Sequence, residues 1–201
     1  MTLSALSAVL IDPRDQENAA ILNNTTLSLS IAKIKLREKI NLSVSLLGVL
    51  PTNDILVRNE RFRGGVGTKG ALRFSSIGNS RFDLSFASSI RKNFNDYEIS
   101  ATGNPLLESS FSQELKLDFR ATDRFTTSLF GRYILAKTYA GSERQRFLAD
   151  LSAAYQINKQ WNLNAGITNT GDAFKADGVA SNIRLFDAET TEVYFGVGLS
   201  L

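Results

Sequence analysis

The last ten residues of the chain alternate strictly between apolar side chains and small or polar ones. The apolar positions are Val193, Phe195, Val197, Leu199 and Leu201. The intervening positions are Glu192, Tyr194, Gly196, Gly198 and Ser200. Successive side chains of a β-strand point to opposite faces, so this pattern predicts a strand with one apolar and one polar face.

The same two-residue period recurs along the whole chain and predicts an all-β protein. Ten runs carry it: 2–11, 25–36, 40–50, 65–77, 81–93, 109–121, 125–139, 143–157, 161–173 and 190–201. Most of them exceed the five or six residues usual for soluble strands. They are closer to the roughly 9–11 residues that a tilted strand needs to cross a bilayer.

The connections between these runs alternate in length. Short polar turns are expected at 37–39, 78–80, 122–124 and 158–160, and longer links at 12–24, 51–64, 94–108 and 174–189, with a brief link at 140–142. All three prolines, Pro13, Pro51 and Pro105, fall in the longer links, where a missing amide donor breaks no ladder. Short turns at one end and long loops at the other are typical of membrane β-barrels.

Aromatic side chains flank the short turns. We expect six of them to form an interfacial girdle at one rim: Phe74, Phe82, Phe119, Phe125, Tyr155 and Trp161. Phe82, Phe125 and Trp161 each take the first outward position after a short turn. Aromatic rings concentrate where a barrel wall passes from lipid to water.

Taken together, these features resemble the bacterial outer-membrane β-barrel class over essentially the full chain. The ending Gly196-Val197-Gly198-Leu199-Ser200-Leu201 also resembles the C-terminal strand signal of that class, although it ends in Leu rather than Phe or Trp. The resemblance implies a single domain, 1–201, folded as a closed antiparallel up-and-down transmembrane β-barrel. Ten strands are expected, with eight or twelve as alternatives.

The resemblance also implies surroundings and partners. It places the chain in the outer membrane of a Gram-negative bacterium, against lipid and lipopolysaccharide, after insertion by the barrel-assembly machinery. The first eleven residues lack the basic start of a secretory signal, so we expect a first strand there and a signal peptide removed ahead of it. The alternative is an atypical signal.

Composition excludes several classes of function. The chain has no cysteine and therefore no disulfide or thiolate metal site, and a net charge of +3 argues against nucleic-acid binding. It also has no histidine, the commonest general base and transition-metal ligand. Barrel enzymes of the outer membrane rely on histidine, so the resemblance implies no enzyme. A carboxylate-only hydrolase is the alternative, but no spacing singles out its acids. We expect no cofactor and no metal.

The polar parity would line the lumen of such a barrel. Its charged members are Arg73, Arg81, Asp83, Arg91, Glu114, Lys116, Asp118, Arg120, Arg132, Arg146, Asp150 and Glu192. Unpaired ions in a dry core would each cost several kcal/mol, so these groups are hydrated, paired, or both. Two readings stay open: cross-strand pairs that plug a narrow barrel, or a water-filled path that favours anions.

Lys33 and Lys35 break the alternation, because the apolar parity changes between Ile31 and Ile34. A β-bulge near Ile31 to Lys33 would restore apolar residues to the outer face throughout the run. Without the bulge, the two lysines would face lipid and extend toward the rim. We predict the bulge.

Two local motifs are interpreted as structural. The stretch from Gly64 to Gly70 has the look of a phosphate loop, but Lys69 precedes Gly70 rather than Ser or Thr and no helix pattern follows, so we expect strand and loop glycines. Asp172 and Asp177 lack the ligand spacing of a calcium loop and are expected in a solvated loop.

Three functions remain in order of preference. The first is a narrow, porin-like passive channel for small solutes, favouring anions, with its path lined by Arg73, Arg81, Arg91, Arg120, Arg132 and Arg146. The second is a structural or surface-interaction barrel, plugged by salt bridges and binding partners through its long loops. The third is a soluble secreted β-barrel that binds an apolar ligand.

Overall fold

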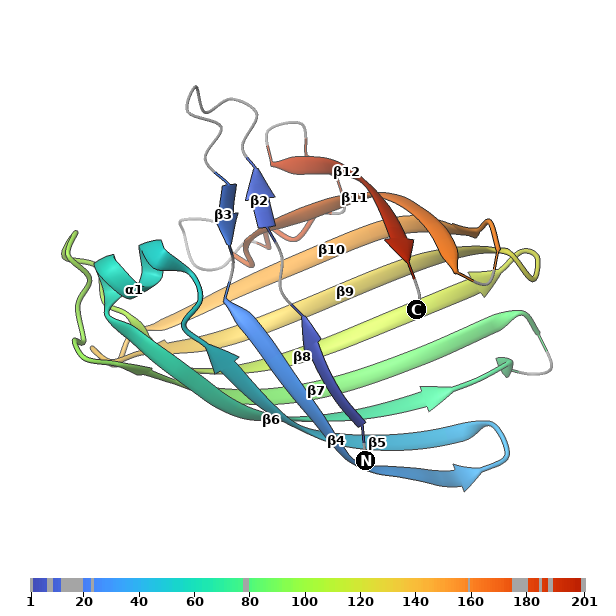
Figure 1. Cartoon of the computed structure of the whole chain (residues 1–201), viewed down its shortest axis with the longest axis horizontal. Helices are drawn as coiled ribbons and strands as arrows, with labels where there is room; N and C mark the ends of the chain where they lie inside the picture. The colour runs from blue at the N-terminus through green and yellow to red at the C-terminus, as the bar shows by residue number, and fades with distance from the viewer. Residues whose placement is uncertain are drawn as a thin grey trace.

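A computed structural model describes residues 2–6, 9–11, 20–22, 24–77, 80–158, 160–174, 181–184, 186–187 and 190–199. Ten strands form one antiparallel sheet, which curves along its width (Figure 1). In sheet order they are β1 (Thr2–Leu6), β4 (Thr25–Arg37), β5 (Ile40–Leu50), β6 (Phe62–Phe74), β7 (Phe82–Asn95), β8 (Leu107–Arg120), β9 (Phe125–Thr138), β10 (Glu143–Gln156), β11 (Trp161–Asp172) and β12 (Thr191–Leu199).

Each of the ten predicted runs overlaps one of these strands, so the all-β antiparallel prediction is confirmed. The run 2–11 is wrong as a single strand. Leu6 pairs with Thr26 near the start of β4, so a longer β1 would soon run out of residues to pair with. The chain instead forms a separate two-stranded sheet from β2 (Val9–Ile11) and β3 (Ala20–Leu22).

The link between β5 and β6 contains a short helix that the periodicity does not predict, α1 (Asp54–Glu60). The side chain of Asn53 caps it by accepting a hydrogen bond of 3.0 Å from the amide of Leu56. Arg61 ends it in the left-handed conformation, with φ of 51°. Seven residues are too few for a helical period to stand out. No helix in the described part of the chain is long and apolar enough to span a membrane.

The alternation of connection lengths is confirmed. The turns between β4 and β5, β6 and β7, β8 and β9, and β10 and β11 lie at one end of the sheet, on the right in Figure 1. The longer links, including α1, lie at the other end. Most of loop 12–24, together with Asp177, Ser200 and Leu201, lies outside the described residues.

The two faces of the sheet differ in polarity. Large apolar side chains such as Leu115 and Phe195, the latter 71% exposed, cover one face. On the polar face, Lys69 of β6 contacts Glu114 of β8 across the intervening β7. Adjacent strands are about 4.8 Å apart, so contacts across a whole strand require side chains that converge. The polar face is therefore the concave one, called the inner face below.

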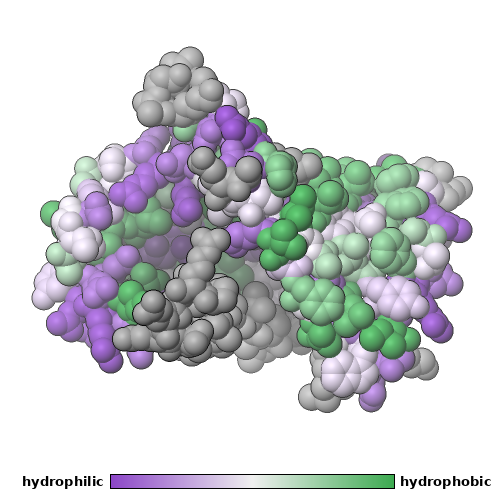
Figure 2. Space-filling model, turned by 90° about the horizontal axis from the view of Figure 1, so that it is seen from above, coloured by the Kyte–Doolittle hydropathy of each residue, from purple (hydrophilic) through white to green (hydrophobic). Residues whose placement is uncertain are grey.

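On the side of the molecule seen from above Figure 1, hydrophobic side chains are concentrated toward the end with the short turns. Figure 2, which views the molecule from above Figure 1, shows hydrophobic side chains gathered toward that end. Hydrophilic ones gather toward the end with the long links. The wall thus has an apolar zone and a polar rim.

β1 and β12 are the two edges of the sheet, and no pairing joins them in the described residues. Closure into a barrel and the final number of strands therefore stay predictions. Val193 of β12 is 82% exposed, because no further strand shields it on that side. Each edge presents a row of backbone groups available for pairing.

The predicted bulge in β4 is confirmed. Ser30 pairs with Ser45 and Ala32 pairs with Val44, which leaves Ile31 as an extra residue. Lys33 then falls opposite Ser43, and Lys35 opposite Asn41. Both lysine positions thereby share the parity of the inner face, as a restored alternation requires.

Deleting Ile31 should leave the protein able to fold, because the shortened β4 would keep every later residue on its present face. We expect a stability change within about 1 kcal/mol. Deleting Ser43 from the regular strand β5 should abolish folding, since it exchanges the faces of the residues on one side of the deletion. Refolding yield in detergent, read as an SDS mobility shift on heating, compares the two. Equal loss of folding in both variants would contradict the bulge.

Candidate functional site

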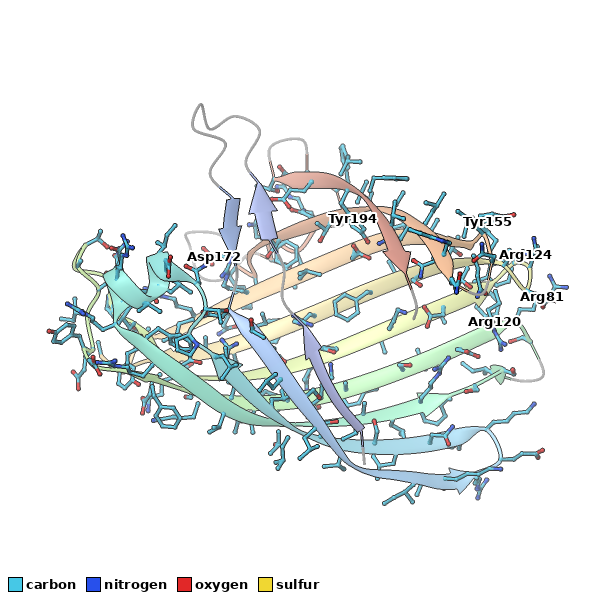
Figure 3. The ribbon with its side chains drawn as sticks, viewed as in Figure 1. Arg81, Arg120, Arg124, Tyr155, Asp172 and Tyr194 are labelled. Carbon is cyan, nitrogen blue, oxygen red and sulfur yellow. The ribbon has the colours of Figure 1, made fainter. Side chains whose placement is uncertain are left out.

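The register places the predicted lumen-lining residues on one parity of the sheet. Eleven of the twelve lie in strands on the inner face: Arg73, Asp83, Arg91, Glu114, Lys116, Asp118, Arg120, Arg132, Arg146, Asp150 and Glu192. Arg81 immediately precedes β7, and its guanidinium donates to the carbonyl oxygen of Ala121. Figure 3 shows Arg81 and Arg120 at the end with the short turns, whereas Asp172 lies toward the other end.

Asp83 organises the first charged cluster, close to the short-turn end. It is only 3% exposed, and its two carboxylate oxygens accept hydrogen bonds from Arg73 Nη2 at 2.9 Å and Arg120 Nη2 at 3.0 Å. The backbone amide of Ser76 donates a third bond, at 2.8 Å. One carboxylate thus holds two cations, and the cluster retains a net positive charge.

Glu114 organises a second cluster, near the middle of β8. It accepts from Lys69 Nζ at 2.5 Å and from Arg132 Nη2 at 2.8 Å. Again one carboxylate lies between two cations. Lys69 is absent from the predicted lumen residues because it lies in the glycine-rich stretch 64–70. Its parity with Arg73 nevertheless indicates the inner face.

The remaining inner charges are less fully paired. Lys116 binds Asp118 at 2.8 Å, and Asp150 accepts a hydrogen bond of 2.9 Å from the hydroxyl of Tyr194. Arg146 makes no ion pair within the described residues. Across the described inner face, three carboxylates engage five cations, so pairing leaves a basic surplus.

The six predicted girdle aromatics lie on the outer face at the short-turn end of their strands. The rings of Phe82 and Phe119 pack with centroids 4.8 Å apart. Tyr155 pairs with Phe125, and Trp161 begins β11. Phe74, at the end of β6, pairs with Leu84. Tyr155 is seen at the same end as Arg81 and Arg124 (Figure 3).

A cavity of about 850 Å³ opens on the inner face at the long-link end. Its lining comes from β7, from α1 and from the loop 96–106, with further residues from β4, β5, β6, β8 and β10. The amide of Ala101 donates to the carbonyl of Asn59 at 3.1 Å, which joins the loop to the helix. Burial raises the pKa of Glu60, which also lines the cavity. Periodicity gives no indication of this cavity, because α1 and loops supply more than half of its lining residues.

Small residues on β6 make room beside the cavity. Gly65 pairs with Asn93, and Gly67 pairs with Arg91. A Cβ atom on Gly67 would lie 2.4 Å from the carbonyl oxygen of Ile90, and one on Gly65 would lie 3.2 Å from Asn93 Oδ1. The interpretation of this stretch as strand glycines is confirmed, and the loop expected at its start is wrong, because the whole stretch lies within β6. Among the residues that the structure describes, no group of His, Cys, Asp or Glu is placed to hold a metal ion.

Comparison with known proteins finds similarity in structure alone. No family model matches the chain. No curated protein matches it in sequence. The fold is similar to that of OmpT, an outer membrane protein of Vibrio cholerae folded in vitro, in its trimer form, with a TM-score of 0.51 and 9% identity over 98% of this chain. A second structure of that protein gives a TM-score of 0.49 and 8% identity over 97% of this chain. The chain spans 63% and 62% of the lengths of these two structures.

Replacing Asp83 with Ala should destabilise the protein by about 1–3 kcal/mol, because two guanidinium groups and one backbone amide lose their shared acceptor. Asp123→Ala is the control, since Asp123 lies in an exposed turn and makes no ion pair within the described residues; its effect should stay within about 0.5 kcal/mol. Equilibrium unfolding in urea measures both. Equal stability of the two variants would show that the Asp83 cluster contributes nothing.

Proposed function

We propose that this protein is an outer-membrane β-barrel that acts as a narrow passive channel for small solutes and favours anions. The observation that carries the proposal is the sharing of Asp83 and of Glu114 between two cations each. Such sharing leaves positive charge along a polar concave wall. Rings of basic side chains favour anions in pores by the same electrostatics.

The distribution of polarity supports a membrane location. The outer face, which only part of the link between β11 and β12 covers in the described residues, carries the large apolar residues, and aromatic rings follow one end of it. A soluble protein would leave this face in water at a cost of roughly 25 cal/mol for each Å² of apolar surface. Lipid on the outer face removes that cost, and the fold similarity to an outer membrane protein agrees with this placement.

We also propose that the sheet closes into a barrel through its edges β1 and β12. Backbone groups left unpaired in lipid each cost several kcal/mol, so a membrane sheet cannot keep open edges there. β1 and β12 run antiparallel, because successive strands in the ten-stranded sheet alternate in direction. They are therefore oriented for direct pairing. A ten-stranded barrel is only slightly wider than an eight-stranded one, which gives a narrow path.

Closure can be tested by disulfide formation, since the chain has no native cysteine. We expect Ala5→Cys combined with one of Val193→Cys, Phe195→Cys or Val197→Cys to give an intramolecular disulfide in the refolded protein. These positions share the outer parity of the two edge strands. The pair Leu129→Cys and Leu151→Cys, which are direct partners on β9 and β10, is the positive control. Disulfides only between chains, or none while the control forms, would refute direct closure.

Anion preference can be tested by reversal potentials in planar bilayers under a KCl gradient. Arg146→Glu should lower the chloride-to-potassium permeability ratio severalfold, because it reverses an inner charge without leaving a carboxylate unpaired. Lys137→Glu makes the same charge change at an outer-face position of β9 and should leave the ratio unchanged. Absence of current from the pure refolded protein would overturn the channel proposal.

A second candidate is a structural or surface-interaction barrel, and one observation favours it. Part of the link between β11 and β12 lies against the outer wall: Asn169 donates to the carbonyl of Arg184 at 2.9 Å and accepts from Thr190 at 2.7 Å. Asn169 and its neighbour Phe147 are thereby buried. The described part of this link, held on the wall, is suited to contact a partner. Under this reading the bilayer current is absent and the ion pairs only close the lumen.

A further inference from the structure

The inner-face cavity contains three buried polar atoms without hydrogen-bond partners. They are Arg91 Nε, Asn93 Oδ1 and Asn95 Oδ1, and they come from three successive inner positions of β7. Only one other side-chain atom in the described residues shares this state, Arg132 Nε. Buried polar atoms are nearly always hydrogen-bonded in folded proteins. The grouping of three at one cavity therefore marks a binding site.

The orientation of the two amides follows from their other contacts. Asn93 Nδ2 donates to the carbonyl of Leu107 at 3.2 Å, and Asn95 Nδ2 donates to the carbonyl of Glu60 at 3.1 Å. Turning either amide over would bring two carbonyl oxygens together, so the free atom in each case is the oxygen. Asn93 is only 7% exposed, which makes the unpaired oxygen costly.

These atoms specify the hydrogen bonds that a ligand must offer. Two amide oxygens require donors, whereas the N–H of Arg91 requires an acceptor. A simple anion such as phosphate supplies acceptors and would face the two amide oxygens unfavourably. An ammonium ligand supplies donors, but the two cations of the lining, Arg91 and Arg144, outnumber its one carboxyl group, Glu60, so the net charge of the lining opposes a cation. A hydroxyl group donates and accepts at once.

We propose that this cavity binds a polyhydroxylated solute, a monosaccharide or its sugar acid. Its hydroxyl groups donate to Asn93 Oδ1 and Asn95 Oδ1, and one of its oxygens accepts from Arg91 Nε. The volume of about 850 Å³ is within the range of small-molecule sites. Apolar residues of the lining, among them Ile55 and Leu106, supply surface for the C–H faces of a sugar ring. A role for this site in filtering solutes at the entrance of a channel rests on the proposed function. The binding of a sugar to the site does not.

Isothermal titration of the refolded protein with D-glucose, D-gluconate and inorganic phosphate tests the proposal in a detergent without a sugar headgroup. We expect saturable binding of glucose and gluconate. Asn93→Leu and Asn95→Leu should each weaken it about fivefold, the equivalent of one hydrogen bond. Asn162→Leu, an inner asparagine near the opposite rim, is the matched control and should leave binding unchanged.

Saturable binding of phosphate without either sugar would overturn the proposal, and so would sugar affinity that neither Asn93→Leu nor Asn95→Leu changes. Lack of any saturable sugar binding would show a cavity that holds only water. Circular dichroism and the SDS mobility shift on heating establish that each variant is folded. Because titration needs no ion flow, a protein that binds glucose but carries no current would retain this site and lose only the channel.

Discussion

The fold depends on the alternation of side chains between two faces of one continuous sheet. Because every second residue is apolar, a single set of backbone hydrogen bonds supports two surfaces of opposite character. The outer surface carries Leu115 and Phe195, and the inner one carries Asp83 and Glu114. In the described part of the chain, no compact apolar interior forms between two layers, so the cohesion of the sheet comes from strand pairing and from the polar inner face.

On that inner face, the ratio of carboxylates to cations determines the preference for one sign of solute charge, whereas the number of ion pairs does not. An inner face with one carboxylate for each cation would be electrically neutral and would favour neither anions nor cations. Here Asp83 forms ion pairs with Arg73 and Arg120. Glu114 forms ion pairs with Lys69 and Arg132. Pairing fixes the positions of the cations, and the surplus keeps part of their field available to solutes.

The sequence predicts the strands well and the loops poorly, for a physical reason. A strand repeats every two residues, so runs such as 40–50 reveal their limits and faces without reference to distant residues. Even the bulge at Ile31 follows from a break in that repeat. The helix α1 and the cavity depend on contacts between residues far apart, such as Asn95 with Glu60, which no local period encodes. Closure of the sheet is hard to predict from the sequence for the same reason, because it depends on pairing between the first and the last strand.

The bulge also shows what the alignment of β4 and β5 depends on. A strictly alternating strand can slide by two residues along its neighbour and still present the same faces, so competing alignments have nearly equal energies. The extra residue at Ile31 does not remove this degeneracy, because the change of phase lies within β4 itself and β5 alternates regularly. The connection therefore sets the alignment of this hairpin: Arg37 pairs with Ile40 across a two-residue turn, and a slide of two residues would require a longer turn. The bulge and the turn thus have separate tasks, since one assigns side chains to faces and the other places the two strands against each other.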